Sequence, residues 1–191
     1  MNKIILFLSK IFNYRKARKM NKVGKNVFIN AHLKTFNASS IQLGSNLHIG
    51  KNCTLMCYKV QDKIGKIVLD DDSCIGDCFR VETGGDVVIG KHNLIASNVS
   101  IYSHNHGTNP IKACGFGGQP LSGKDVCIKE ECWIGEKVII LPGVTIGEHS
   151  IIGAGSIVTK SIPSYSIAVG NPAKIIKKWD FENNEWKRNK D

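Results

Sequence analysis

The stretch that decides the fold runs from Cys127 to Lys160 and reads CIKEECWIGEKVIILPGVTIGEHSIIGAGSIVTK. A helix face would repeat about every 3.6 residues and a half-buried strand every two, whereas here an aliphatic residue returns at every sixth position. A strict period of six indicates a short supersecondary unit that stacks on its own copies. The aliphatic positions are Ile128, Ile134, Ile140, Ile146, Ile152 and Val158. The pattern predicts a mainly β protein, a parallel β-helix of hexapeptides whose aliphatic positions fill the axis.

Two further positions of the hexapeptide have a predicted role. Small residues stand two places before the aliphatic one, where they would fit near a corner of the prism: Cys132, Val138, Val144, Ser150 and Ser156. Glycine follows the aliphatic residue at Gly135, Gly147 and Gly153, and we expect it to supply turn dihedrals that a β-carbon would resist. Three hexapeptides would close one triangular coil of about eighteen residues.

Composition and charge limit the partners of the chain. Its 191 residues suit one domain with short appendages, and its net charge is +10. The lysines and arginines concentrate toward the two ends, so we expect anionic partners. Nucleic acid is not predicted, because no stacking platform or recognition-helix motif accompanies the charge. Phosphates on a small ligand, or a membrane surface, fit the charge better.

The seven cysteines do not form a recognisable framework. Cys53 and Cys57, like Cys74 and Cys78, are separated by three residues rather than two, so neither a zinc ribbon nor a secreted disulfide framework is predicted. We interpret cysteine here as a small, half-buried apolar residue. A reducing, cytoplasmic compartment follows from that interpretation.

Residues 1–22 are predicted to form an amphipathic, basic helix. Its apolar part, Ile4 to Phe12, is too short to span a bilayer, and no signal-peptide cleavage pattern follows it. Two interpretations stay open. The helix covers the open end of the solenoid, or it lies on an anionic membrane, which would add peripheral contact with the inner face of that membrane.

The hexapeptide rhythm extends over residues 23–172, and each slip in its phase is expected at a corner of the prism, because the axis tolerates no insertion. The longest interruption covers about residues 102–125, which are rich in Gly, Pro, Asn and Ser. We predict an extruded loop with a function. His104 and His106 stand at its base. Residues 173–191 form a basic segment with three aromatic residues, predicted to be a short helix that lies on a coil.

The repeats, the histidine loop and the ending IGAGSIVTKSIPSYSIAVGNPAKIIKK (residues 152–178) together carry a resemblance. Over residues 23–178 the chain resembles the hexapeptide-repeat O-acetyltransferases. It looks most like the branch of maltose, galactoside and nodulation-factor enzymes and of related enzymes that acetylate capsule or lipopolysaccharide sugars. The resemblance implies a left-handed β-helix and a homotrimer with active sites between subunits. It also implies acetyl transfer from acetyl-CoA to a hydroxyl of a sugar or polysaccharide precursor.

Acetyl transfer from a thioester to a hydroxyl needs a base, because the hydroxyl is a poor nucleophile until its proton is taken. Neutral histidine, with an unperturbed pKa of about 6.5, can accept the proton and return it to the leaving thiolate. The resemblance implies that His104, which follows a strand into the loop, is the base of a direct transfer. His106 stays open as the alternative. The remaining histidines are interpreted as outward polar residues: His32, His48, His92 and His149.

The resemblance also implies binding residues. Those for acetyl-CoA are Ala154, Thr159, Lys160, Lys174, Lys177 and Glu136. Relatives carry basic residues at the last two lysine positions, but lysine offers no bidentate contact to phosphate. Those for the acceptor are Trp133, Asn98 and Glu82. The tryptophan offers an apolar plane for a sugar ring, although packing at a subunit interface would also explain it.

Three alternatives come from other functional classes. A metal-dependent hydratase on the same solenoid needs three histidines around zinc, and the loop supplies two, so no metal is predicted. A non-catalytic binding or structural subunit would need neither the histidine loop nor the Gly170–Lys174 ending. Enzymes that use another acyl donor, such as an acyl carrier protein, carry a helical domain after the solenoid, and only about 19 residues follow Pro172. The sugar and the hydroxyl that receive the acetyl group stay open, as does whether the acceptor is free, lipid-linked or polymeric.

Overall fold

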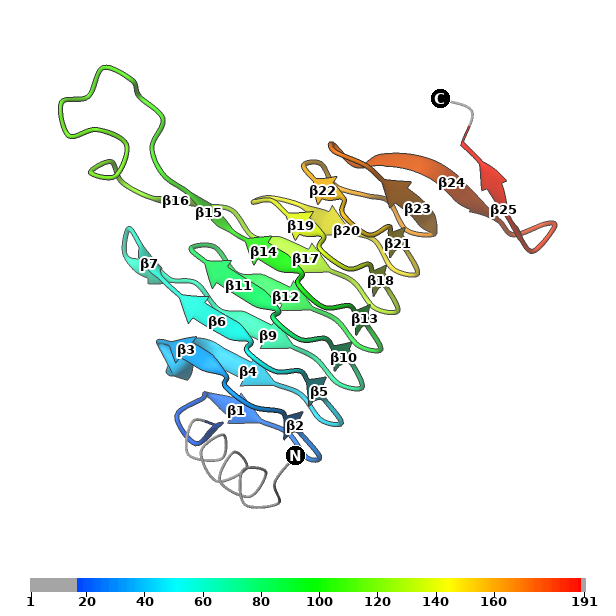
Figure 1. Cartoon of the computed structure of the whole chain (residues 1–191), viewed down its shortest axis with the longest axis horizontal. Helices are drawn as coiled ribbons and strands as arrows, with labels where there is room; N and C mark the ends of the chain where they lie inside the picture. Colours follow the sequence, from blue (N-terminus) through cyan, green and yellow to red (C-terminus); the bar gives the residue numbers. More distant parts are fainter. Residues whose placement is uncertain (1–16, 190–191) are drawn as a thin grey trace.

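The fold is a prism of three parallel sheets, and Figure 1 shows its coils stacked along one axis. The computed structural model describes residues 17–189. Sheet A contains β1 (Lys22–Val23), β4 (Ile41–Leu43), β9 (Ile67–Leu69), β12 (Val87–Ile89), β17 (Val126–Ile128) and β20 (Thr145–Ile146). Sheet C contains β3 (Lys34–Phe36), β6 (Thr54–Cys57), β11 (Arg80–Thr83), β14 (Ser100–Tyr102), β19 (Ile139–Ile140) and β22 (Ile157–Val158). The prediction of a mainly β, parallel solenoid is confirmed.

Sheet B is longer than the other two, because a hairpin extends it at one end. It contains β2 (Phe28–Ile29), β5 (His48–Ile49), β10 (Cys74–Ile75), β13 (Leu94–Ile95), β18 (Trp133–Ile134), β21 (Ile151–Ile152), β23 (Ser166–Val169), β24 (Lys174–Asp180) and β25 (Glu185–Arg188). The chain visits sheets A, B and C in turn. We therefore name the corners of the prism A–B, B–C and C–A, after the sheets that each one joins.

The core is a set of columns along the axis. Parallel pairing places Ile75 beside Ile95, Ile95 beside Ile134 and Ile134 beside Ile152, and all four side chains are buried. Burying an isoleucine side chain stabilises the folded state by roughly 1.5–3 kcal/mol. The prediction that the aliphatic position fills the axis is thus confirmed. The small residues predicted near the corners are buried as well: Cys132, Val138, Val144, Ser150 and Ser156.

The expected role of glycine needs correction. Gly135 and Gly147 do not have positive φ angles, and the corners instead place residues such as Asn98 (φ 62°) and Glu131 (φ 56°) in the left-handed region. A β-carbon on Gly147 would lie 2.2 Å from the backbone nitrogen of Ser164, and one on Gly135 2.6 Å from that of Ala154. Glycine recurs at these positions because neighbouring coils approach closely there.

Both long phase slips fall at the C–A corner, as expected. The first is a small hairpin formed by β7 (Lys59–Val60) and β8 (Lys63–Ile64). The second is the predicted loop, which has a two-stranded antiparallel base of β15 (His104–Asn105) and β16 (Ser122–Gly123). We call residues 104–123 the arm, since Figure 1 shows this segment projecting away from the prism.

The predicted C-terminal helix is wrong. β24 and β25 form an antiparallel extension of sheet B beyond β23, and Figure 1 shows these two strands reaching beyond the coils. The last parallel strand offers unpaired backbone groups at its edge, and pairing them with β24 satisfies those groups, which a helix lying on a coil would not do. Ile175 also packs against the core from this strand.

The predicted N-terminal helix lies mostly outside the described residues. Within residues 17–189 the structure has one 3-10 turn with its own bounds, η1 (Ala38–Ser40). No helix in that range is long and apolar enough to cross a bilayer.

All seven cysteines fall within the described range and are free. Burial raises the pKa of Cys53, Cys57 and Cys132 to about 11, as expected for small core residues. The interpretation as half-buried residues is wrong for Cys74, Cys78 and Cys114, which are exposed.

Phe79 provides a test of the core. It is fully buried at the B–C corner, where the preceding coil carries the smaller Cys53 and the following coil Val99. Phe79→Ala should lower the free energy of unfolding by about 3–5 kcal/mol, because it leaves a cavity that neighbouring coils cannot fill. Urea denaturation followed by circular dichroism measures the change. Ile111→Ala, at a side chain 89% exposed, is the control and should change stability by less than about 0.5 kcal/mol. Equal effects of the two substitutions would contradict this account of the core.

Candidate active site

His104 stands where the arm leaves the C–A corner. It is the first residue of β15, and its side chain is half-buried. Its Nδ1 is 3.3 Å from the carbonyl oxygen of Glu82 on β11. A carbonyl oxygen can only accept, so in this bond Nδ1 carries the proton and Nε2 keeps its lone pair. The contact therefore favours the tautomer in which Nε2 can accept a proton.

Tyr58 packs against this histidine edge-on, with the ring centroids 5.5 Å apart. Desolvation, and after it the charge of Glu82, raises the pKa of the Tyr58 hydroxyl. Tyr58 therefore stays a protonated donor beside the imidazole at neutral pH. Glu82 itself forms an ion pair with Arg80 on the same strand.

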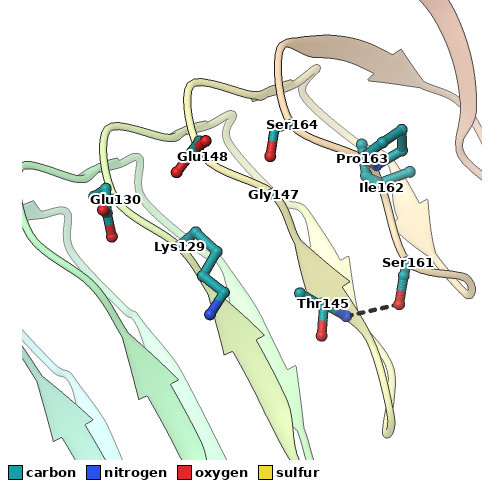
Figure 2. Close-up of a pocket in the computed structure, with 9 residues that line it drawn as sticks. All are labelled: Lys129, Glu130, Thr145, Gly147, Glu148, Ser161, Ile162, Pro163 and Ser164. Carbon is teal, nitrogen blue, oxygen red and sulfur yellow. Dashed lines mark hydrogen bonds between the residues drawn. The ribbon is translucent and has the colours of Figure 1, made fainter.

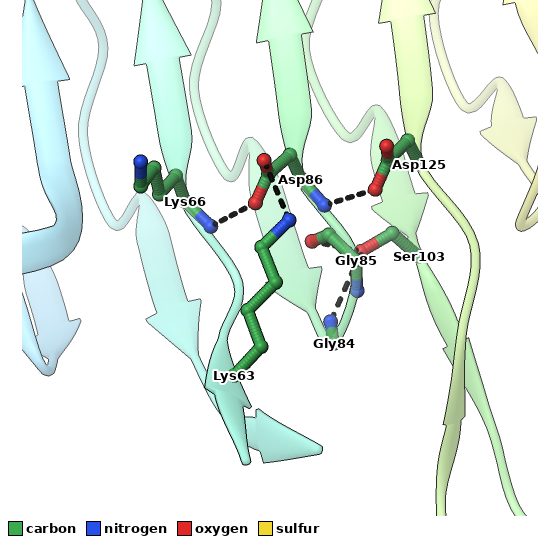
Figure 3. A network of polar contacts seen from close by, with 7 residues as sticks. All are labelled: Lys63, Lys66, Gly84, Gly85, Asp86, Ser103 and Asp125. Atoms are coloured by element: carbon green, nitrogen blue, oxygen red, sulfur yellow. Dashed lines mark hydrogen bonds and ion pairs between the residues drawn. The ribbon is translucent and has the colours of Figure 1, made fainter. Parts of the chain in front are cut away.

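The backbone around His104 is held by a buried serine, shown in Figure 3. The Ser103 hydroxyl accepts hydrogen bonds from the N–H groups of Gly84 (3.0 Å) and Gly85 (3.1 Å) and donates one to the carbonyl of Gly85 (2.9 Å). A β-carbon on Gly84 would lie 2.7 Å from Cβ of His104 and 2.6 Å from Cγ2 of Val60. The glycine pair thus lets the small hairpin and the arm meet without displacing the histidine.

An ionic network joins the same loops (Figure 3). The Asp86 carboxylate accepts hydrogen bonds from Nζ of Lys63 (2.9 Å) and from the backbone N–H of Lys66 (3.0 Å). The backbone N–H of Asp86 in turn donates to Asp125 (2.7 Å). Partial burial acts to raise the pKa of Asp86, but its bonds to the two lysines outweigh that effect and lower it. The network fixes the small hairpin against the segment in which the chain returns from the arm to the prism.

Gln119 anchors the arm internally. It is 6% exposed among neighbours that are exposed. Its Oε1 accepts from the N–H of Asn109 (3.0 Å), and its Nε2 donates to the carbonyls of Asn109 (2.8 Å) and Gly115 (3.2 Å). The arm is therefore a closed loop that is held together by its own hydrogen bonds. His106 lies on it with an exposed side chain.

The predicted binding residues fall into two groups beside sheet C. Asn98, Glu136 and Ala154 occupy the B–C corner of successive coils. There Nδ2 of Asn98 donates to Oε1 of Glu136 (3.4 Å) and the N–H of Gly155 donates to the Glu136 carbonyl (2.7 Å). Thr159 and Lys160 follow β22 at the C–A corner, the corner of His104. The sheet C face between the two corners is thus the surface that most predicted residues border.

Three predicted residues lie elsewhere. Trp133 points outward from sheet B and is 51% exposed, on the face opposite the corner of His104. Lys174 and Lys177 are exposed on β24, beyond the last coil. A single chain therefore does not bring Trp133 and His104 together.

A shallow hollow of about 570 Å³ lies on the sheet A side of the last coils (Figure 2). Its walls include Lys129, Glu130 and Glu148, and the N–H of Thr145 donates to Oγ of Ser161 across its floor (2.9 Å). None of the predicted site residues lines it. Among residues 17–189 no group of three or more His, Cys, Asp and Glu side chains is arranged to hold a metal ion.

Comparisons with known proteins place this geometry in a family. Residues 126–160 match the family model described as bacterial transferase hexapeptide (six repeats). The chain is 34% identical to "Putative lipopolysaccharide biosynthesis O-acetyl transferase WbbJ" of Escherichia coli K12 over 158 residues, 80% of this chain and 79% of that protein. The chain belongs to the hexapeptide-repeat acetyltransferases.

Solved structures of two further acyltransferases resemble this hexapeptide-repeat acetyltransferase. AntD, an N-acyltransferase from Bacillus cereus in complex with dTDP-4-amino-4,6-dideoxyglucose and coenzyme A, has a TM-score of 0.73 and 27% identity, covering 90% of this chain and 91% of that one. A galactoside acetyltransferase in complex with coenzyme A has a TM-score of 0.62 and 25% identity, covering 93% of this chain and 74% of that one.

Three residues that surround His104 were not predicted from the sequence of this acetyltransferase. Tyr58 contacts the histidine across 46 positions of sequence, and no local pattern signals such a contact. Ser103 and Gly84 had a weaker signal, since the phase slip at Gly84–Gly85 and the start of the arm meet at one corner. Only the register of β11 with β14 shows that they touch.

Gly84 offers a test of how His104 is positioned. Gly84→Ala should lower acetyl-transfer turnover about tenfold or more, because the new methyl group forces the histidine to move and a base must be held within a fraction of an ångström. The melting temperature should fall only slightly if Val60 yields. Steady-state kinetics with acetyl-CoA, together with a thermal melt, separate the two effects.

Gly117→Ala is the matched control, since a β-carbon there meets nothing within 4 Å. It should leave both turnover and melting temperature close to those of the native chain. Full activity of Gly84→Ala would show that the close contact does not position the histidine.

Proposed function

We propose that the chain transfers the acetyl group of acetyl-CoA to a hydroxyl of a sugar or polysaccharide precursor, with His104 as general base. The observation that supports this most directly is the contact between Nδ1 of His104 and the Glu82 carbonyl, at 3.3 Å. It leaves Nε2 free to accept a proton, and it fixes the plane of the ring. His106 has an exposed side chain on the arm and lacks such an anchor among the contacts described above.

In the proposed direct transfer, Nε2 takes the hydroxyl proton as the hydroxyl oxygen attacks the thioester carbonyl carbon. The carbonyl electron pair moves onto oxygen, and backbone N–H groups at a coil edge stabilise the resulting oxyanion. When the tetrahedral intermediate collapses, the carbon–sulfur bond breaks and the protonated His104 returns its proton to the leaving thiolate. The products are an acetyl ester and free coenzyme A.

The acetyl-CoA site in this proposal lies along sheet C on the C-terminal side of His104. Between the two corners the outward side chains Ser100, Ile139 and Ile157 stand in line, which gives the pantetheine arm a smooth surface. Ala154 and Glu136 border this strip on one side and Thr159 on the other. The exposed amines of the flanking lysines suit phosphates: Lys160, Lys174 and Lys177. The complexes of AntD and of the galactoside acetyltransferase with coenzyme A support this choice of donor.

A left-handed winding and a homotrimer complete the proposal. Trp133 can reach an acceptor beside His104 only if it comes from a second copy, since the two lie on opposite sides of one prism. The outer face of sheet B also carries an apolar column in register with Trp133, as a subunit interface would: Leu94, Trp133, Ile151 and Ile167. Association would cover this column and complete three sites between subunits. Asn98 and Glu82 would then act on the acceptor from sheet C.

The two histidines of the arm are separated by substitution. His104→Ala should lower turnover by about a hundredfold or more, the usual contribution of a general base, with little change in acetyl-CoA binding. His106→Ala should cost much less. Thiol release from acetyl-CoA, measured with a panel of mono- and oligosaccharides, gives both values. If His106→Ala abolishes turnover and His104→Ala retains most of it, the base is His106.

The oligomeric state is a separate prediction. Light scattering at micromolar concentration should give a mass near three times the 21.0 kDa of one chain. Trp133→Asp should lower that mass, because a charge placed in a buried interface is costly without a partner. A native mass near that of a single chain would refute the trimer.

A further inference from the structure

Three side chains on the N-terminal side of His104 form a surface that we call the aromatic shelf: Phe36, Met56 and Tyr58. Phe36 pairs in register with Met56, which pairs with Glu82, so the shelf continues directly into the histidine site. The Phe36 and Tyr58 ring centroids are 5.8 Å apart, and those of Tyr58 and His104 are 5.5 Å apart. A row of three rings therefore leads from β3 to the candidate base.

The shelf is not needed for the core. Leu55 and Cys57, the inward residues of β6, are fully buried, whereas Phe36 points outward from β3 and is 48% exposed. Charged groups lie next to the shelf on β11, where Arg80 forms an ion pair with Glu82. Aromatic planes beside polar and charged groups are suited to a sugar, whose ring has an apolar C–H face and a rim of hydroxyls.

The position of the shelf along the axis decides which substrate it takes. A base must lie between the two reactants, and the residues proposed for acetyl-CoA all lie on the C-terminal side of His104, from Glu136 to Lys177. The shelf lies on the other side, on coils that precede the arm. Resting on the function proposed above, this arrangement assigns the shelf to the acceptor.

We propose that the acceptor is a glycan of at least two sugar units. The unit that receives the acetyl group lies against Tyr58, beside Nε2 of His104, and its neighbour lies on Phe36. The spacing of the two aromatic rings is comparable to the advance from one pyranose to the next in a glycan. A free monosaccharide would fill only the Tyr58 position and would gain nothing from Phe36.

Two assays test this proposal with the full-length protein. The first measures acetyl-CoA hydrolysis without any acceptor, which depends on the base and the donor site alone. The second measures transfer of radiolabelled acetyl groups to an array of immobilised mono-, di- and trisaccharides. Phe36→Ala should reduce transfer to the longer glycans about three- to tenfold, the loss expected for one stacked ring. Hydrolysis, the KM for acetyl-CoA and transfer to any monosaccharide should stay within twofold of the native values.

Two further variants serve as controls. Phe36→Trp keeps an aromatic plane and should restore transfer to the longer glycans. Phe181→Ala removes another exposed phenylalanine, on the C-terminal hairpin far from the arm, and should leave both assays unchanged. A parallel loss of hydrolysis in Phe36→Ala would mean that the ring only supports the fold, and the proposal would be wrong.

The remaining outcomes also decide the proposal. It is overturned if Phe36→Ala acetylates every glycan as well as the native chain, or if the native protein hydrolyses acetyl-CoA but acetylates no glycan. A native protein that does not use acetyl-CoA at all would instead overturn the proposed function. In that case, retention of fluorescently labelled protein on the same array tests whether the aromatic shelf binds glycans. Phe36→Ala should weaken retention on the longer glycans, and equal retention of both proteins would refute it.

Discussion

The structure depends on the backbone hydrogen bonds that join each coil to the next. In these bonds the N–H of Gly76 donates to the carbonyl of Ile95, and that of Ala96 to the carbonyl of Ile134. Such a ladder exists only if every coil presents its peptide groups at the same places, which is why the sequence repeats every six residues. No coil could bury its inward face alone, so stability is shared between neighbours. Packing of the aliphatic columns follows from the ladder.

The same ladder determines where function can be added. A residue inserted within a strand would shift all later residues out of register, whereas one inserted at a corner leaves the strands in place. The chain places both of its large insertions at the C–A corner, after β6 and after β14, with the corner of the β11 coil between them. The small hairpin and the arm can therefore touch, through Gly84, Ser103 and the Asp86 network. The regular scaffold thus lets irregular loops surround His104 while hydrogen bonds hold those loops in place.

Much of this could be predicted from the sequence, because the period of six reports directly on the axis. The inward residues, the corner positions and the site of the extruded arm all follow from it, and so does His104 at the base of the arm. Contacts between outward side chains do not follow, because the period is silent about them. Tyr58 beside His104, and Trp133 on the opposite face, are visible only once the coils are stacked. The prediction of a C-terminal helix was wrong for a related reason. A short basic and aromatic segment has no strong conformational preference of its own, so pairing with the free edge of sheet B determined its conformation.

That edge has a consequence for self-assembly. A solenoid with an open end could accept the first coil of another molecule and grow into a fibre, since parallel strands add in the same direction. Here β24 runs antiparallel to the coil strands that precede it, and the outermost strand, β25, is short and carries Lys187 and Arg188. A foreign coil would meet a short edge strand with two positive charges on it, separated from the coils by the reversed β24. The hairpin therefore acts as a terminator that keeps the repeats from polymerising through this end.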